Sequence, residues 1–120
     1  MILHLTSVDT TKGKISLSDY RGKWVVLFAY PADFTPICEA DTLGFVRKKA
    51  EFDELGVQFI GWSVDSVESH RKWIEEIADR VGVRIDYPLI ADVDKKLAER
   101  YGILHKNKGV TYRGVFIIDP

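Results

Sequence analysis

The sequence is poor in cysteine: Cys38 is the only one among its 120 residues. A single cysteine cannot form a disulfide within the chain, and it excludes a CxxC redox pair. A free thiol stays reduced in the cytosol, so we expect a cytoplasmic protein. The sequence shows no signal-peptide pattern, which agrees with that expectation.

Excess charge and long apolar runs are also missing. The 17 basic and 18 acidic side chains give a formal net charge of −1, so no global field would attract nucleic acid or an anionic membrane. No stretch of 18 consecutive apolar residues occurs, as a membrane-spanning helix would require. We therefore expect neither a nucleic-acid partner nor a membrane partner.

Internal repeats, low-complexity segments and linkers are absent as well, so we expect residues 1–120 to form a single domain. Hydrophobic residues make up 46% of the chain, which is enough for one core. The alternation of apolar runs with helical patterns predicts an α/β fold with a layered sheet. We expect strands at 24–30, 57–64, 87–91 and 113–119, helices at 36–55, 67–81 and 92–101, at most a short edge segment in 1–12, and a polar loop at 103–110.

Capping residues and apolar stripes support the expected helices. Asp65 and Glu68 have the spacing of a capping box before the second helix, and Asp92 is expected to cap the third. A glycine is expected to end each helix. These glycines are Gly56, Gly82 and Gly102, and the expected buried stripes are Leu43, Val46, Ala50 and Phe52 in the first helix and Val67, Trp73, Ile74, Ile77 and Val81 in the second.

The chemistry is expected where the apolar run 24–30 meets the first helix. Thr35 suits the N-cap position and Pro36 the first helical position, which places Cys38 in the first turn. The Thr35 hydroxyl is then expected to accept a backbone N–H beside Cys38. Unpaired N–H groups and the helix dipole in that turn favour a thiolate over a thiol. The pattern therefore predicts a reactive sulfur.

Other readings of these residues remain open on the sequence alone. A lone cysteine in a small α/β domain is often a buried core residue, and Arg113 alone could be a surface or edge-strand arginine. The pair Asp92 and Asp94 resembles a metal site, but a helix cap explains it better. The histidines and tryptophans are expected to have structural roles: His4, His70 and His105 as solvated or structural residues, and Trp24, Trp62 and Trp73 as core.

The stretch Pro-x-x-x-Thr-x-x-Cys, formed by Pro31, Thr35 and Cys38, resembles the active-site signature of the peroxiredoxins. Three further segments resemble that family in order and spacing, from about Thr11 to the last residue. They are residues 14–23 before the buried strand, Ser63-Val64-Asp65-Ser66 with the following helix, and the arginine-bearing strand at 112–119. The Asp-Phe-Thr-Pro sequence before the cysteine is similar to that of the one-cysteine branch.

The resemblance implies a thioredoxin-like fold, with a mixed central sheet flanked by helices, and a thiol-dependent peroxidase. Cys38 would be oxidised by hydrogen peroxide or an organic hydroperoxide to sulfenic acid. Arg113 would stabilise the thiolate and orient the peroxide, Thr35 would donate its hydroxyl hydrogen, and Pro31 would cover the site. An external thiol would be the reductant, because the chain has no second cysteine, and the family implies no haem, flavin or metal. We also expect a homo-oligomer, at least a dimer.

The chain departs from the family pattern in two ways. Asp41 stands where the family usually has glutamate, and together with Glu39 it places carboxylates near the thiolate, which opposes ionisation unless arginines pair with them. The family pattern also continues with a further strand, a second arginine and a helix, which we expect to be missing from residues 1–120. The alternatives are a non-catalytic thioredoxin-like interaction module or an inactive truncated fragment; a thiol–disulfide oxidoreductase is disfavoured by the absent CxxC.

Overall fold

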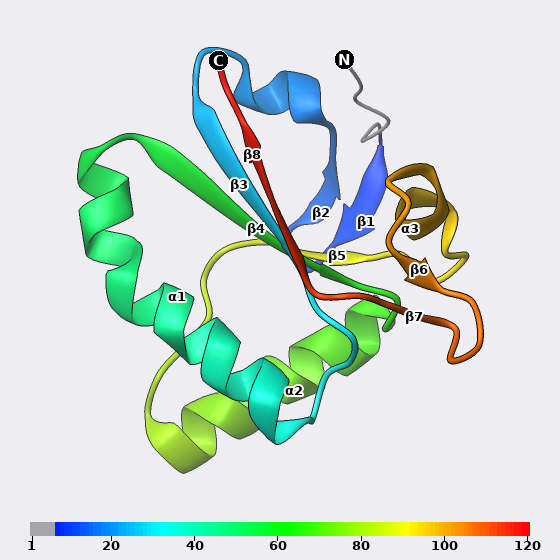
Figure 1. Ribbon diagram of the computed structural model, residues 1–120. Helices are drawn as coiled ribbons and strands as arrows, with labels where there is room; N and C mark the ends of the chain where they lie inside the picture. Colours follow the sequence, from blue (N-terminus) through cyan, green and yellow to red (C-terminus); the bar gives the residue numbers. More distant parts are fainter. Residues whose placement is uncertain (1–6) are drawn as a thin grey trace.

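A six-stranded mixed sheet forms the centre of the protein (Figure 1). The computed structural model describes residues 7–120, and the expectations for His4 and the rest of residues 1–6 lie outside that range. Three neighbouring strands run parallel, and the others add to the sheet antiparallel. In order across the sheet they are β2 (Gly13–Ile15), β1 (Val8–Thr10), β5 (Leu89–Ala91), β4 (Val57–Ser63), β3 (Trp24–Ala29) and β8 (Gly114–Ile118).

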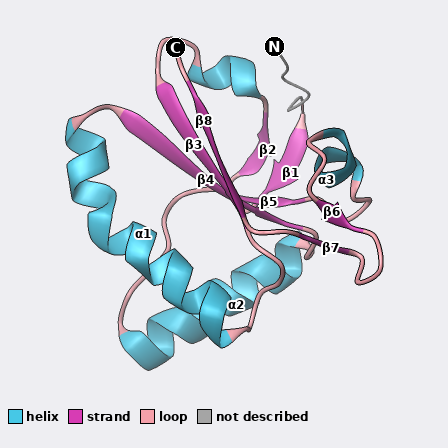
Figure 2. Ribbon diagram, in the orientation of Figure 1, coloured by secondary structure: helices cyan, strands magenta, loops and turns pink. Residues whose placement is uncertain are grey.

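Helices cover both faces of this sheet (Figure 2). The long helices α1 (Pro36–Glu54) and α2 (Val67–Val81) lie on one face, and α3 (Lys96–Arg100) and the 3-10 helix η1 (Leu17–Tyr20) lie on the other. The small hairpin of β6 (Leu104–His105) and β7 (Val110–Thr111) occupies the segment expected to be a loop. No helix within residues 7–120 is both long and apolar enough to cross a membrane.

Strand β3 is buried on both sides because its residues alternate between the two cores. Val26 and Phe28 face the core under α1 and α2, whereas Leu27 and Ala29 face the core under α3. The parallel pairing of β3 with β4 through α1 confirms the expected strand–helix–strand unit. This unit places the α1 N-terminus at the carboxyl end of β3, the position where ligands bind in open parallel sheets.

Close packing also explains one glycine of β4. A Cβ atom added to Gly61 would lie 2.5 Å from Cδ2 of Leu89, which is fully buried on the neighbouring strand. Real Cβ atoms do not approach other carbon atoms so closely, so the side chain of Leu89 occupies the space left by the glycine.

Three expected core residues are exposed. Trp24 is 48% exposed at the first position of β3, before the strand passes beneath the helices, whereas Trp62 and Trp73 are fully buried as expected. Ala50 of α1 and Val81 at the end of α2 also face solvent, although Phe52, two residues after Ala50, still packs against Phe59 of β4. The periodicity of a sequence marks the face of a helix, but not which residues on that face the core covers.

The helix caps differ from the expected ones in detail. Ser66, not Asp65, caps α2, and its side chain accepts a hydrogen bond from the Ser69 backbone N–H at 3.0 Å. The Asp65 carboxylate points back toward the loop after β3 instead. Helix α3 begins later than expected, at Lys96, although the Asp92 carboxylate still accepts from its backbone N–H groups, as a capping residue does.

Candidate active site

Cys38 lies in the first turn of α1, as the sequence predicts. Thr35 is the N-cap, with extended backbone angles (φ −116°, ψ 140°), and Pro36 is the first helical residue. The Cys38 side chain is buried, with 1% of its surface exposed. The sulfur is therefore held at the helix N-terminus, where the helix dipole favours a thiolate. It is also largely shielded from water, which by itself disfavours the charged form.

The hydroxyl of Thr35 does not make the expected capping bond. The side chain accepts no hydrogen bond from the first turn, and its Oγ1 donates to the backbone carbonyl of Ala32 at 3.0 Å. A threonine can either cap the helix or close the preceding loop, and here it closes the loop. Pro31 lies partly exposed in the same loop, directly after the last buried residue of the β3 run.

Arg113 contacts the sulfur across 75 positions of sequence. Its Nη2 lies 3.3 Å from Cys38 Sγ and its Nε lies 3.0 Å from Asp41 Oδ2. The contact follows from strand pairing: Gly114 pairs with Ala29, so Arg113 lies beside the end of β3, where the loop to α1 begins. One planar guanidinium thus joins the thiol to the carboxylate one helical turn away.

Both carboxylates near the sulfur are paired with arginine. Asp41 is held by Arg113, and Glu39 is contacted by Arg80, a residue of α2 that also pairs with Glu76. From the sequence, these carboxylates were expected to oppose a thiolate unless arginines pair with them. The structure supplies an arginine for each. The shorter Asp41 side chain still reaches Arg113, because Arg113 approaches α1 from the edge of the sheet.

Sequence reasoning missed two residues next to this site, Asp33 and His70. Both are buried, and His70 Nδ1 lies 2.8 Å from Asp33 Oδ2. The spacing of His70 could have revealed its burial, because it precedes Trp73 by three residues and Ile77 by seven on the inner stripe of α2. His70 is therefore structural and buried rather than solvated.

A possible metal-ligand group occurs at the same place. Side-chain atoms of Asp33, Asp65 and His70 lie within 4.8 Å of one another. Both carboxylates and both ring nitrogens already have hydrogen-bond partners within the protein. A hydrogen-bonded network explains this cluster without an ion, because buried polar groups must be paired.

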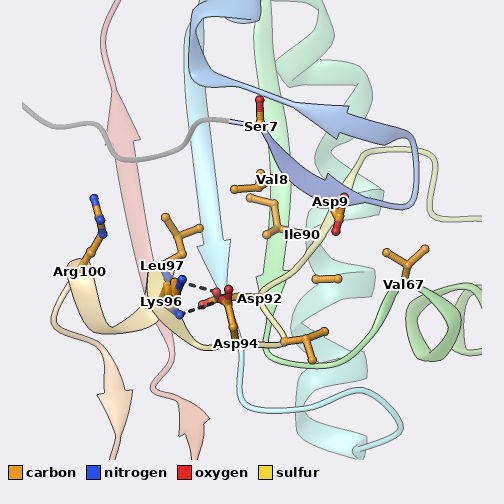
Figure 3. Close-up of a pocket in the computed structure, with 12 residues that line it drawn as sticks. Ser7, Val8, Asp9, Val67, Ile90, Asp92, Asp94, Lys96, Leu97 and Arg100 are labelled. Atoms are coloured by element: carbon orange, nitrogen blue, oxygen red, sulfur yellow. Dashed lines mark hydrogen bonds between the residues drawn. The ribbon is translucent and has the colours of Figure 1, made fainter.

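A surface pocket of about 670 Å³ lies away from the sulfur, beside β1, β5 and α3 (Figure 3). Its lining includes Asp92, whose carboxylate accepts hydrogen bonds from the backbone N–H groups of Leu97 (3.1 Å) and Ala98 (2.7 Å). Burial raises the pKa of Asp92, and these hydrogen bonds oppose the increase. The Asp92 and Asp94 pair thus serves the start of α3, as the capping interpretation predicts, and Cys38 is not part of this pocket.

Comparisons with known proteins agree with the geometry of the site. Residues 3–120 match the model of the AhpC/TSA family. The chain is 51% identical over 114 residues to a protein named peroxiredoxin 2 from Picrophilus torridus, covering 95% of this chain and 57% of that protein. It is 50% identical over 115 residues to a peroxiredoxin from Thermotoga maritima, covering 94% and 54%. The chain therefore spans just over half the length of these relatives.

Solved structures show the same fold. A cysteine-to-serine mutant of peroxiredoxin 6 from Arenicola marina superposes with a TM-score of 0.88 at 34% identity, covering 100% of this chain and 59% of that one. A yeast mitochondrial 1-Cys peroxiredoxin gives a TM-score of 0.80 at 37% identity, covering 99% and 63%. These matches confirm the thioredoxin-like α/β fold expected from the sequence. On the family match, the sequence identities and the shared fold together, the chain belongs to the AhpC/TSA family and its relatives are peroxiredoxins.

Proposed function

We propose that the chain carries the catalytic centre of a thiol-dependent peroxidase, with Cys38 as its nucleophile. The observation that carries this proposal is the contact of Arg113 Nη2 with Cys38 Sγ at 3.3 Å, in the first turn of a helix. A fixed cation and a helix N-terminus together favour the thiolate, which is the reactive form of cysteine. The relatives named peroxiredoxins support a peroxide as the electrophile.

In the proposed step, the Cys38 thiolate attacks the terminal oxygen of a hydroperoxide, ROOH. An S–O bond forms, the O–O bond breaks, and RO⁻ leaves with the bonding electron pair and takes up a proton to become ROH. The sulfur is oxidised by two electrons to sulfenic acid, and the peroxide is reduced. Hydrogen peroxide and small organic hydroperoxides fit best, because the sulfur is almost completely buried.

The neighbouring residues would serve this step from the positions described above. Arg113 would stabilise the thiolate and then the departing oxygen, while Asp41 holds the guanidinium in place. The Thr35 hydroxyl would have to turn from the Ala32 carbonyl to donate to the peroxide. Pro31 would cover the loop side of the site.

A reductant must come from outside the chain, because it contains no second cysteine. A small thiol or a redox protein would condense with the sulfenic acid to give a mixed disulfide and water. A second thiol would then release Cys38 as a thiol and form a disulfide with the first. The proposal includes a cytosolic location, where such thiols are abundant.

We further propose a homo-oligomer, formed along β8. This strand has β3 as its single partner among the described residues and lies at one edge of the sheet. Val115 and Ile117 on it are 52% and 68% exposed, and an apolar strand edge readily pairs with a second copy. Light scattering should show association that Ile117→Lys weakens; a monomeric parent at high concentration would contradict this part of the proposal.

Peroxide consumption in the presence of a dithiol reductant tests the activity. The parent should consume hydrogen peroxide with turnover, and Cys38→Ser should not, although the two side chains are similar in size and the fold should persist. Equal consumption by the parent and Cys38→Ser would refute the nucleophile. A parent that folds but never turns over would favour the alternative of a non-catalytic interaction module or inactive fragment.

A further inference from the structure

A buried polar network ties the loop before Cys38 to helix α2. Its centre is the Asp33 carboxylate, which has three side-chain partners: Tyr30 OH at 2.7 Å, Ser69 Oγ at 2.9 Å and His70 Nδ1 at 2.8 Å. The other ring nitrogen of His70, Nε2, lies 2.9 Å from the carbonyl oxygen of Ile90 on β5. Asp33 is 6% exposed, and Tyr30 and His70 are fully buried.

Hydrogen-bond chemistry fixes the donors in this network. A carbonyl oxygen can only accept, so His70 Nε2 carries a proton toward Ile90. His70 Nδ1 then faces both carboxylate oxygens, and a second proton must lie between the ring and Asp33 for the contact to be favourable. Burial, followed by the Asp33 charge, raises the pKa of Tyr30 well above its ordinary value, so its hydroxyl remains a donor. With one proton shared between the ring and the carboxylate, the hydrogen bonds of the pair are satisfied.

The backbone of the loop is anchored at the same residue. The backbone N–H of Asp33 donates to Asp65 Oδ2 at 2.8 Å, and Ser63 Oγ donates to that same oxygen at 2.7 Å. Asp33 precedes the helix cap Thr35 by two residues and Cys38 by five. Its side chain and its main chain are therefore both fixed just before the turn that carries the sulfur.

The anchor acts on the first turn of α1, because Phe45, Val46 and Phe52 pack against the core roughly two to four turns further along the helix. Of its 19 residues, three are buried: Cys38, Thr42 and Leu43. Helix α2, in contrast, buries His70, Trp73, Ile74 and Ile77 along one stripe against the sheet. The hydrogen bonds of the network hold the loop before α1 against α2 and β5. They thereby limit movement of the first turn of α1, where a small displacement would separate Cys38 Sγ from Arg113.

We propose that Asp33 and His70 are positioning residues, which hold Cys38 against Arg113 by locking the loop before α1 onto α2. Neither residue contacts the sulfur or the peroxide, so both act through the geometry of the first turn. This inference rests on the proposed function for its biological meaning, but the placement of the sulfur can be measured without peroxide. Misplacement of a reacting group by about 1 Å can cost roughly a hundredfold in rate.

The test compares His70→Gln and Asp33→Asn with Asp92→Asn. Asp92 is another buried aspartate that holds a helix terminus, but its carboxylate accepts hydrogen bonds from Leu97, Ala98 and Trp62. Three properties are measured for each protein: the thermal unfolding temperature, the rate of Cys38 alkylation by iodoacetamide, and the thiolate absorbance against pH. Alkylation reports sulfur reactivity whether or not the chain reduces peroxides.

We expect His70→Gln and Asp33→Asn each to slow alkylation at neutral pH by about tenfold and to move the thiolate titration to higher pH. The double variant should slow alkylation little more than either single change does, because both changes break the same contact between residues 33 and 70. Asp92→Asn should lower the unfolding temperature yet leave the alkylation rate within about twofold of the parent. Parent rates in folded His70→Gln, or an equal loss in Asp92→Asn, would overturn the inference.

Ser69→Ala keeps the test decisive if the two larger changes prevent folding. Ser69 is partly exposed and supplies one of the three donors to Asp33. Its loss should slow alkylation by about twofold to threefold, and an unchanged rate would count against the network. A parent that fails to consume peroxide would refute the proposed function alone, whereas alkylation still decides the positioning role.

Discussion

Replacing Arg113 with alanine should make Cys38 markedly harder to ionise. In the folded protein Nη2 of the guanidinium lies 3.3 Å from the sulfur, and Nε of the same guanidinium donates to Asp41 at 3.0 Å. Arg113→Ala removes the positive charge and leaves the Asp41 carboxylate one helical turn from the thiol without its partner. Both changes disfavour a negative sulfur.

The size of the effect follows from the distance and the exposure. Two unit charges at this separation interact by about 1.3 kcal/mol at the dielectric constant of water and by about 5 kcal/mol at an effective value of about 20. The Arg113 side chain is 43% exposed, so the true value lies nearer the lower figure. Since about 1.4 kcal/mol corresponds to a factor of ten in an equilibrium, the thiolate fraction at neutral pH should fall by up to about tenfold.

The assay is thiolate absorbance followed against pH, with the rate of peroxide consumption as a second measure. Arg84→Ala is the matched control, because Arg84 is a similarly exposed arginine that pairs with Glu75, away from the sulfur. Asp41→Ala should have the opposite sign or a small effect, since it removes a negative charge but also releases Arg113. An Arg113→Ala titration that coincides with the parent would refute the electrostatic reasoning and make Arg113 a structural residue.

Two further predictions concern stability. Tyr30 has a pKa raised well above 10 by burial and by Asp33, so above about pH 10 the unfolded chain loses this proton first and stability falls as pH rises. Tyr30→Phe should therefore reduce the slope of unfolding free energy against pH there by up to about 1.4 kcal/mol per unit, measured by denaturant titration; an unchanged slope would exclude Tyr30 as the cause. Gly61→Ala should lower stability by about 1–3 kcal/mol, because its Cβ would lie 2.5 Å from Leu89; a parent-like denaturation midpoint would show that Leu89 moves aside freely.

The sequence was sufficient for the parts of the fold that depend on local patterns. The apolar run 24–30, the threonine–proline helix start and the glycine after α1 each correspond to an observed feature, and Gly56 has the positive φ of 72° expected after a helix. Local patterns could not fix the exact cap of α2, because Asp65 and Ser66 are adjacent and both suit the position. Asp65 is drawn away by the Asp33 backbone, a contact 32 positions distant.

The first-turn position of Cys38 could be predicted from local sequence, whereas the role of Arg113 was predicted only from the family resemblance. Nothing in the local sequence around Arg113 shows that it reaches Cys38, because the contact depends on the pairing of β8 with β3. The capping bond of the Thr35 hydroxyl was predicted wrongly, since capping and loop closure use the same residue type at the same place. The burial of His70 was not predicted, because histidine is polar and its partner Asp33 is 37 positions away in the sequence.

The most direct test of the account is the mass of the intact protein after exposure to one equivalent of hydrogen peroxide. The reduced chain should gain a single oxygen atom located at Cys38, and a dione that reacts with sulfenic acids should then attach at the same residue. Cys38→Ser should gain neither. A parent whose Cys38 stays unmodified, or in which the oxygen is found on Met1 instead, would contradict the claim that this helix terminus activates its sulfur for peroxide.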